Sequence, residues 1–180
     1  MLGDSLSAGY GIRPEQGWVA LLDQRLKARG YGYRVVNASV SGETTSGGLE
    51  RLPRALELHH PAIVVLELGA NDALRGLPLE VASSNLERMI ELARDAGARV
   101  LLVGMRIPPN YGPRYAQEFT QLFERLAAQR HVPLVPFLLE RVALNPGLMQ
   151  DDGLHPNAQA EPAVLDTLWP HLEPLLKKGA

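Results

Sequence analysis

The stretch AIVVLEL (62–68) places one carboxylate among apolar, partly β-branched residues. A nearly continuous apolar run of this length is typical of a parallel strand that is covered on both faces. The stretches YRVVNA (33–38), RVLLVG (99–104) and VPLVPF (132–137) have the same character. Met1-Leu2-Gly3 reads as the end of one further strand, so the chain predicts a parallel sheet.

Amphipathic stretches alternate with these strands, and their apolar residues recur at the period of a helix with one buried face. They cover residues 17–29, 79–96, 115–127 and 165–176. A helix over 44–60 is a weaker prediction because Pro53 interrupts it. Alternating strands and helices favour βαβ units with helices on both faces of the sheet. Because no linker or repeat divides the chain, we expect one three-layer α/β domain over residues 1–180.

The composition is that of an ordinary globular protein, with 46% apolar residues, 21% charged residues and a formal net charge of -2. No run of like charges is present, which argues against a nucleic-acid partner. The absence of cysteine excludes a disulfide scaffold, a thiolate nucleophile and a cysteine-based zinc site. No apolar run approaches the ~20 residues that a membrane helix needs, so we expect no membrane span.

In a parallel α/β sheet the binding crevice lies beyond the carboxyl ends of the strands. The chemistry of this protein is therefore expected in the segments that follow the strands and in one late polar segment. These read GDSLSAGYG (3–11), SVSGETTSGG (39–48), GANDALRG (69–76), MRIPPNYG (105–112) and QDDGLHPNA (150–158). Four of the five carry groups that suit acyl transfer.

Ser5, His155 and Asp152 are the candidates for nucleophilic catalysis. Ser5 follows a strand end, where a turn exposes its hydroxyl group. Asp152 precedes His155 by three residues across a glycine, a spacing that lets the carboxylate reach Nδ1 and leaves Nε2 as a base. A plain Gly-Asp-Ser turn and an Asx turn before the last helix are the alternatives, and Asp151 is the second choice of carboxylate.

Gly42 and Asn71 are the candidate oxyanion donors, with the backbone N–H of Ser5 as a third. A glycine lets its N–H approach a ligand without an intervening Cβ. Asn71 offers a neutral side-chain N–H directly after the 62–68 strand. Each residue taken singly is equally typical of an ordinary turn, so their shared position at one sheet edge carries the prediction.

These blocks together resemble the SGNH, or GDSL, hydrolases, whose family name records one Ser, Gly, Asn and His in separate blocks. GDSLSAGYG, NASVSGETTSGG, LGANDALRG and DDGLHPN occur here in the family order and span Gly3 to Asn157. The chain is most similar to the thioesterase-I, lysophospholipase and arylesterase branch, a bacterial group. The resemblance implies a flavodoxin-like, five-stranded parallel sheet of order 2-1-3-4-5, a triad of Ser5, His155 and Asp152, an oxyanion hole of Ser5, Gly42 and Asn71, and no metal or cofactor.

The start of the chain departs from the family pattern. In relatives the first strand runs several residues before Gly-Asp-Ser, whereas only Met1 and Leu2 precede it here. We therefore expect a truncated first strand, and a fuller version with apolar β-forming residues ahead of Met1. Relatives are commonly exported, so the resemblance implies a periplasmic or secreted enzyme after signal removal, with a cytoplasmic location as the alternative.

The resemblance and the loops predict a serine hydrolase of carboxylic esters, acyl thioesters or lysophospholipids with medium-length acyl chains. The segments 73–78 and 105–111 are apolar and proline-rich, which suits the walls of an acyl groove. The residues expected to bind substrate are Leu74, Arg75, Arg106, Ile107, Pro108 and Tyr111. A carbohydrate deacetylase of the same fold and a non-catalytic flavodoxin-like binding module are the alternatives. We expect a monomer or weak oligomer acting on a small-molecule substrate.

Overall fold

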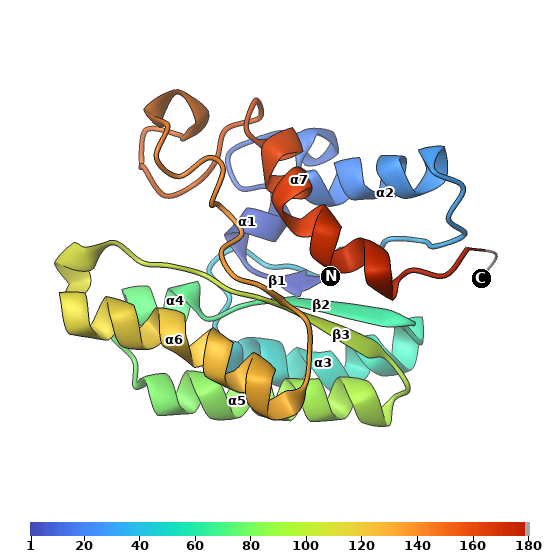
Figure 1. Cartoon of the computed structure of the whole chain (residues 1–180), viewed down its shortest axis with the longest axis horizontal. Coiled ribbons are helices and arrows are strands. Elements are labelled where there is room, and N and C mark those ends of the chain that lie inside the picture. Colours follow the sequence, from blue (N-terminus) through green and yellow to red (C-terminus); the bar gives the residue numbers. More distant parts are fainter. Residues whose placement is uncertain (179–180) are drawn as a thin grey trace.

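A computed structural model describes residues 1–178 and contains a parallel sheet of four strands (Figure 1). The strands are β1 (Leu2–Gly3), β2 (Ile63–Glu67), β3 (Arg99–Val103) and β4 (Leu134–Val135), in the order β1-β2-β3-β4. Leu2 pairs with Leu66, Val64 pairs with Val100, and Leu102 pairs with Leu134. The predicted α/β class with a parallel sheet is confirmed.

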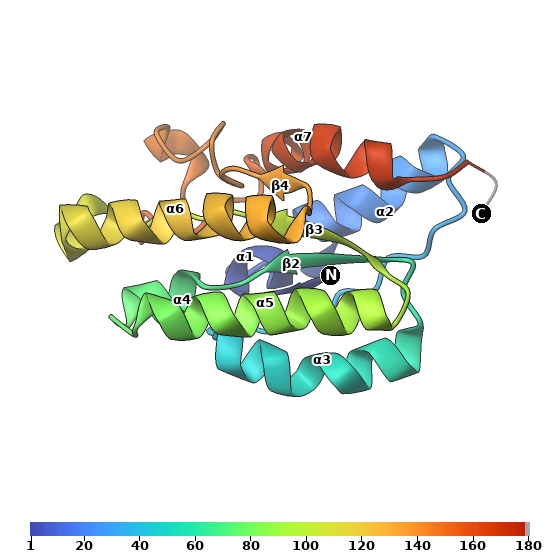
Figure 2. The same ribbon diagram turned by 60° about the horizontal axis from the view of Figure 1, so that its bottom comes forward.

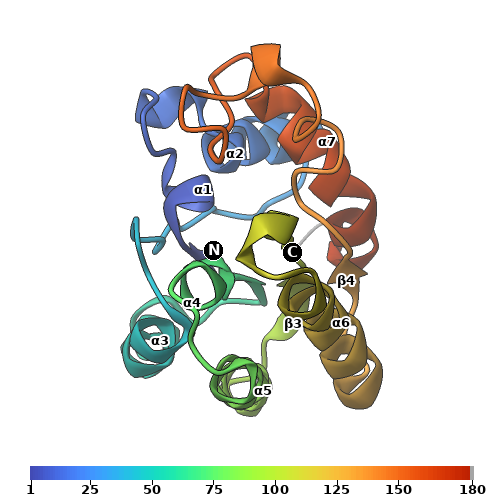
Figure 3. The same cartoon turned by 90° about the vertical axis from the view of Figure 1, so that its left-hand side faces the viewer.

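Helices cover both faces of this sheet. Figure 3 shows α2 and α7 on one side and α3, α5 and α6 in an arc on the other, and Figure 2 shows the same layers from a second direction. The helices are α1 (Ser5–Ala8), α2 (Trp18–Ala28), α3 (Thr45–His59), α4 (Ala70–Leu74), α5 (Leu79–Asp95), α6 (Pro113–Arg130) and α7 (Glu161–Leu172). The 3₁₀ turns are η1 (Pro14–Gln16), η2 (Pro109–Tyr111), η3 (Pro146–Leu148) and η4 (Glu173–Leu175).

The long helices agree with the sequence pattern, including the weaker prediction over 44–60, and the last helix differs in its bounds. The helix over 44–60 forms as α3 with Pro53 inside it, because its apolar face packs on the core through Leu52 and Leu56. The last helix begins at Glu161 and ends at Leu172, earlier at both ends than the expected 165–176. Pro162 favours the earlier start because proline suits a first helical turn.

The expected fifth strand over 33–38 is absent among residues 1–178, so the prediction of five strands is wrong. This segment does run alongside the start of the chain. The amine of Met1 donates to the Val36 carbonyl at 2.8 Å, and the Ala38 N–H donates to the Met1 carbonyl at 2.9 Å. A regular ladder needs a partner along its length, and β1 comprises only Leu2–Gly3.

A cavity of about 350 Å³ lies beside Met1, at the amino end of β1. Its lining includes Tyr33–Val36 from the extended segment, together with Ile63 and Val65 from β2. Burial lowers the pKa of the Met1 amine to about 6. The cavity separates the 33–36 segment from β2 at this end of the sheet.

Candidate active site

The nucleophile candidate lies at the first residue of α1, immediately after β1. Asp4 caps this helix, because its Oδ1 accepts a hydrogen bond of 3.1 Å from the Leu6 N–H. Gly9 ends the helix in the left-handed conformation with φ of 75°. A strand end, one capping residue and a single helical turn therefore hold Ser5 at the carboxyl edge of the sheet.

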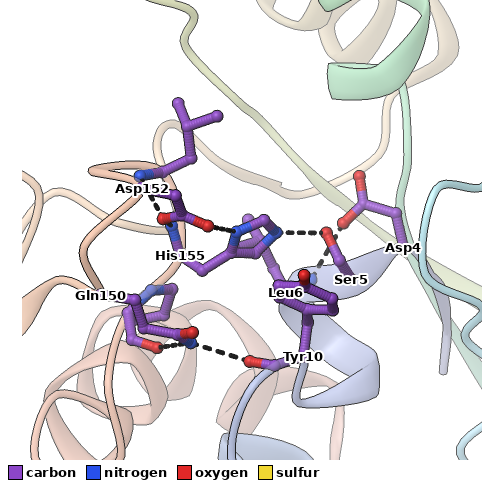
Figure 4. Close-up of polar contacts among 9 residues, drawn as sticks. Asp4, Ser5, Leu6, Tyr10, Gln150, Asp152 and His155 are labelled. Atoms are coloured by element: carbon purple, nitrogen blue, oxygen red, sulfur yellow. Dashed lines mark hydrogen bonds and ion pairs between the residues drawn. The ribbon is translucent and has the colours of Figure 1, made fainter.

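Ser5, His155 and Asp152 form a continuous chain of contacts (Figure 4). The Oγ of Ser5 lies 2.8 Å from Nε2 of His155, and Nδ1 of His155 lies 2.6 Å from Oδ2 of Asp152. An ionised Asp152 accepts a hydrogen bond from Nδ1–H, which leaves Nε2 as the acceptor for the Ser5 hydroxyl group. The geometry thus suits proton transfer from serine to histidine.

The Asp152 carboxylate is fixed by the turn that it begins. Its Oδ1 accepts the backbone N–H groups of Leu154 at 2.9 Å and His155 at 3.0 Å. Burial raises the pKa of Asp152, but these hydrogen bonds and the His155 ring outweigh burial and hold the pKa at about 2. Asp151 is exposed, and its side chain has no hydrogen bond within residues 1–178.

Gln150 joins the histidine loop to the nucleophile loop. Its Nε2 donates to the Tyr10 carbonyl and to the Pro156 carbonyl, both at 2.8 Å (Figure 4). Its backbone N–H donates to the His155 carbonyl at 2.7 Å. The Tyr10 ring lies over the imidazole with centroids 4.7 Å apart. The imidazole is thus held from its own loop and from the serine loop.

The three candidate oxyanion donors differ in their present partners. The backbone N–H groups of Ser5 and Gly42 have no hydrogen-bond acceptor among the described residues, and Gly42 has φ of 78°. The Nδ2 of Asn71 donates to Asp4 Oδ2 at 3.1 Å and to the Glu43 carbonyl at 3.0 Å. The structure thus brings the Asn71 amide next to both donor loops, with its two hydrogens engaged.

A cavity of about 100 Å³ opens beside Ser5. Its polar lining includes Asn71 and His155. Its apolar wall consists of Leu6, Ala70, Leu74, Met105, Ile107, Pro108, Leu139 and Leu154. Four residues expected to bind substrate therefore line it, namely Leu74, Arg106, Ile107 and Pro108.

Arg75 and Tyr111 lie outside this lining. Arg75 donates to the Gly42 carbonyl at 2.9 Å, so it supports the loop of a candidate oxyanion donor. Tyr111 is an exposed residue of η2. The Arg106 guanidinium group lies 4.9 Å from the centroid of the Phe137 ring.

Sequence reasoning left three contributors without a function: Asp4, Glu67 and Gln150. Glu67 carried a signal, because a carboxylate inside a strand covered on both faces must find polar partners. Asp4 and Gln150 resemble ordinary turn residues in the sequence, and only their partners distinguish them. Within residues 1–178, no three His, Cys, Asp or Glu side chains gather in a way that suits a metal ion. No helix in that part of the chain has the length and apolar character to cross a membrane.

The chain is similar to known proteins over nearly its whole length. Residues 1–161 match the model of the GDSL-like Lipase/Acylhydrolase family. The chain is 52% identical to Esterase TesA of Pseudomonas aeruginosa over 98% of this chain and 88% of that protein. It is 43% identical to Thioesterase 1/protease 1/lysophospholipase L1 of Escherichia coli over 98% of this chain and 83% of that protein.

A crystal structure of TesA superimposes with a TM-score of 0.95 at 52% identity, covering 97% of both chains. The chain therefore belongs to the GDSL-like lipase/acylhydrolase family. It is an enzyme, a hydrolase that acts on esters.

Proposed function

We propose that Ser5, His155 and Asp152 form the catalytic triad of this ester hydrolase. The observation that carries the proposal is the unbroken chain of contacts from Ser5 Oγ through the imidazole to the Asp152 carboxylate, at 2.8 and 2.6 Å. A nucleophile, a base in hydrogen-bond reach and a group that orients the base are the parts that acyl transfer needs.

In the first half of the reaction, Ser5 Oγ attacks the carbonyl carbon while its proton moves to Nε2 of His155. The carbonyl oxygen becomes an oxyanion, and the N–H groups of Ser5 and Gly42 are the donors proposed to stabilise it, since neither has another acceptor among the described residues. The tetrahedral intermediate collapses and expels the alcohol or thiol, which takes the proton from Nε2. Water then attacks the acyl-enzyme and gives a proton to Nε2. As the second tetrahedral intermediate collapses, Nε2 returns this proton to Ser5 Oγ, which releases the carboxylic acid and restores the Ser5 hydroxyl group.

Asn71 would join the oxyanion hole by exchanging a partner. Its amide already bridges Asp4 and the Glu43 carbonyl, so one of these bonds must lengthen for an N–H to reach the oxyanion. The bond to the Glu43 carbonyl is the one expected to lengthen. Glu43 is half-buried, so water can replace the lost hydrogen bond there, whereas Asp4 is buried.

We propose medium-length acyl chains as substrates, cleaved from alcohols and from thiols alike. The cavity of about 100 Å³ beside Ser5 has a largely apolar wall, so the first acyl carbons are expected to lie in it. Each buried methylene contributes up to ~0.8 kcal/mol, and the exposed rim at Leu154 adds less per carbon. The kcat/KM is therefore expected to rise from acetyl towards hexanoyl to decanoyl esters, most steeply over the first carbons.

A panel of esters and thioesters of increasing acyl length tests the substrate. If acetyl esters were the best substrates and longer chains were progressively worse, the carbohydrate deacetylase would be favoured instead. A lysophospholipid belongs in the panel because the Escherichia coli relative carries that activity in its name. Export from the cytoplasm and a monomeric or weakly associated state stay predictions.

Labelling with a serine-directed phosphonate tests the nucleophile. The adduct is expected on Ser5, and Ser5→Ala is expected to lose about 10³-fold or more of kcat/KM without a change in folding. Ser41→Ala is the matched control, because Ser41 is an exposed serine of the neighbouring loop. An adduct on Ser7, Ser39 or Ser41, or an active Ser5→Ala variant, would contradict the assignment of Ser5 as the nucleophile.

A further inference from the structure

Two buried carboxyl groups lie beneath the nucleophile, and the steps above use neither. Asp4 is 1% exposed and Glu67, the last residue of β2, is 0% exposed. The Oε2 of Glu67 accepts the Asp4 backbone N–H at 3.2 Å and the Ser7 hydroxyl group at 2.6 Å. Glu67 therefore holds the chain on both sides of Ser5.

Gly3 makes this close arrangement possible. A Cβ at Gly3 would lie 2.6 Å from Oε2 of Glu67 and 2.8 Å from the hydroxyl oxygen of Ser7. Real Cβ atoms do not approach other heavy atoms that closely, so a side chain at this position would displace the carboxyl group or the serine. The glycine of the Gly-Asp-Ser segment thus admits Glu67 under the nucleophile.

The two carboxyl groups are unequal in their hydrogen bonds. Asp4 accepts from the Leu6 N–H and from the Asn71 amide, one bond to each oxygen. Oε1 of Glu67 is buried without a hydrogen-bond partner among residues 1–178. Ionising a buried carboxyl group costs more free energy when one of its oxygens has no hydrogen-bond donor. Glu67 is therefore the group that carries the proton, and Asp4 is the group that is ionised.

The surrounding charges lead to the same assignment. Burial and then the Asp4 charge raise the pKa of Glu67 well above its usual range. Burial raises the pKa of Asp4 to about 6, against its hydrogen bonds and the charge of His155. Near and above neutral pH, Asp4 is therefore the ionised member and Glu67 the neutral one.

We propose that Asp4 is a positioning carboxylate on the serine side of the active site, and that proton-bearing Glu67 braces it there. Asp4 aims the Asn71 amide at the oxyanion position through the 3.1 Å bond. Its negative charge also stabilises the positive charge that the His155 ring gains when it takes the Ser5 proton. Asp4 acts from the serine side of the ring, whereas Asp152 contacts Nδ1 on the other side (Figure 4). The inference rests on the triad proposed above.

Removal of the Asp4 charge is the direct test. Asp4→Asn is nearly isosteric and is expected to lower kcat about tenfold or more with little change in KM, because the lost interactions strengthen in the transition state. The acid limb of the kcat/KM profile is expected to move to lower pH, since a negative charge beside the imidazolium is gone. A purely structural residue would not move that limb. Asp95→Asn, which removes an exposed charge on α5, is the matched control and should change neither quantity.

Two substitutions of Glu67 test whether it holds Asp4 in place. Glu67→Ala is expected to lower kcat about as much as Asp4→Asn, whereas Glu67→Gln restores most of it, since an uncharged amide replaces a neutral acid. If Asp4→Asn folds poorly, Asp4→Ser keeps a helix-capping oxygen without the charge and should show the same shift of the acid limb.

Two outcomes would overturn the inference. One is a wild-type kcat and an unshifted profile in both Asp4 variants. The other is a Glu67→Gln variant as impaired as Glu67→Ala. Phosphonate labelling of Ser5 separates this failure from that of the triad. If Ser5 is still labelled and still essential while Asp4→Asn behaves as wild type, only the function of Asp4 and Glu67 is wrong.

Discussion

The two ends of β1 differ in how closely the neighbouring residues pack and hydrogen-bond. At the Gly3 end, Glu67 accepts the Asp4 backbone N–H at 3.2 Å, the Asn71 amide donates to Asp4 at 3.1 Å, and His155 lies 2.8 Å from Ser5 beside a cavity of about 100 Å³. At the Met1 end, 350 Å³ of mostly apolar cavity separates the 33–36 segment from β2. The candidate active site is therefore held by hydrogen bonds at one end of β1, while the other end borders an apolar cavity.

The largest expected effect lies at the Gly3 end. Asp152→Asn is expected to lower kcat about 10³-fold to 10⁴-fold, because the imidazole loses the carboxylate that sets its tautomer. Asp151→Asn, the neighbouring carboxylate without a hydrogen bond to His155, should change kcat less than about twofold. Steady-state kinetics of both variants checks this, and equal losses would mean that the wrong carboxylate has been assigned.

A change at the Met1 end is expected to act on stability alone. A segment of about five alternating apolar, β-forming residues fused ahead of Met1 can pair with the 33–36 backbone and fill the 350 Å³ cavity. Three buried side chains contribute roughly 1.5–3 kcal/mol each, and ordering the segment offsets most of that, so the free energy of unfolding should rise by about 2 kcal/mol.

Urea unfolding measures this gain, with a Gly-Ser segment of the same length as the control. The kcat should not change, since the cavity lies at the opposite end of β1 from Ser5. If the apolar and Gly-Ser segments stabilise equally, the cavity does not accept a strand.

Gln150, which links the histidine loop to the serine loop, should affect kcat less than the triad residues do. Gln150→Ala removes two hydrogen bonds that join the histidine loop to the Tyr10 carbonyl and to Pro156. With each bond contributing about 1 kcal/mol, a loss of roughly tenfold in kcat is expected as His155 becomes less well placed. Gln159→Ala, an exposed glutamine on the same segment, is the control and should retain its kcat.

Much of the fold follows from local pattern. The apolar run 62–68 and the helical spacing in 79–96 correspond to β2 and α5, because burial on both faces or on one face dictates which positions are apolar. The segment 33–38 carries the same apolar pattern and yet is not a strand. Its state depends on the length of its neighbour β1, which no property of 33–38 encodes.

The sequence by itself determined the family blocks, the parallel α/β class and the residues with reactive chemistry, because these depend on residue type and short spacing. Tertiary structure alone decided which groups act together. It placed Arg75 against the Gly42 carbonyl rather than in the expected substrate wall, and it brought Glu67 to the chain on both sides of Ser5 from 62 residues away. Such pairings depend on the register and packing of distant strands, so only the folded chain specifies them.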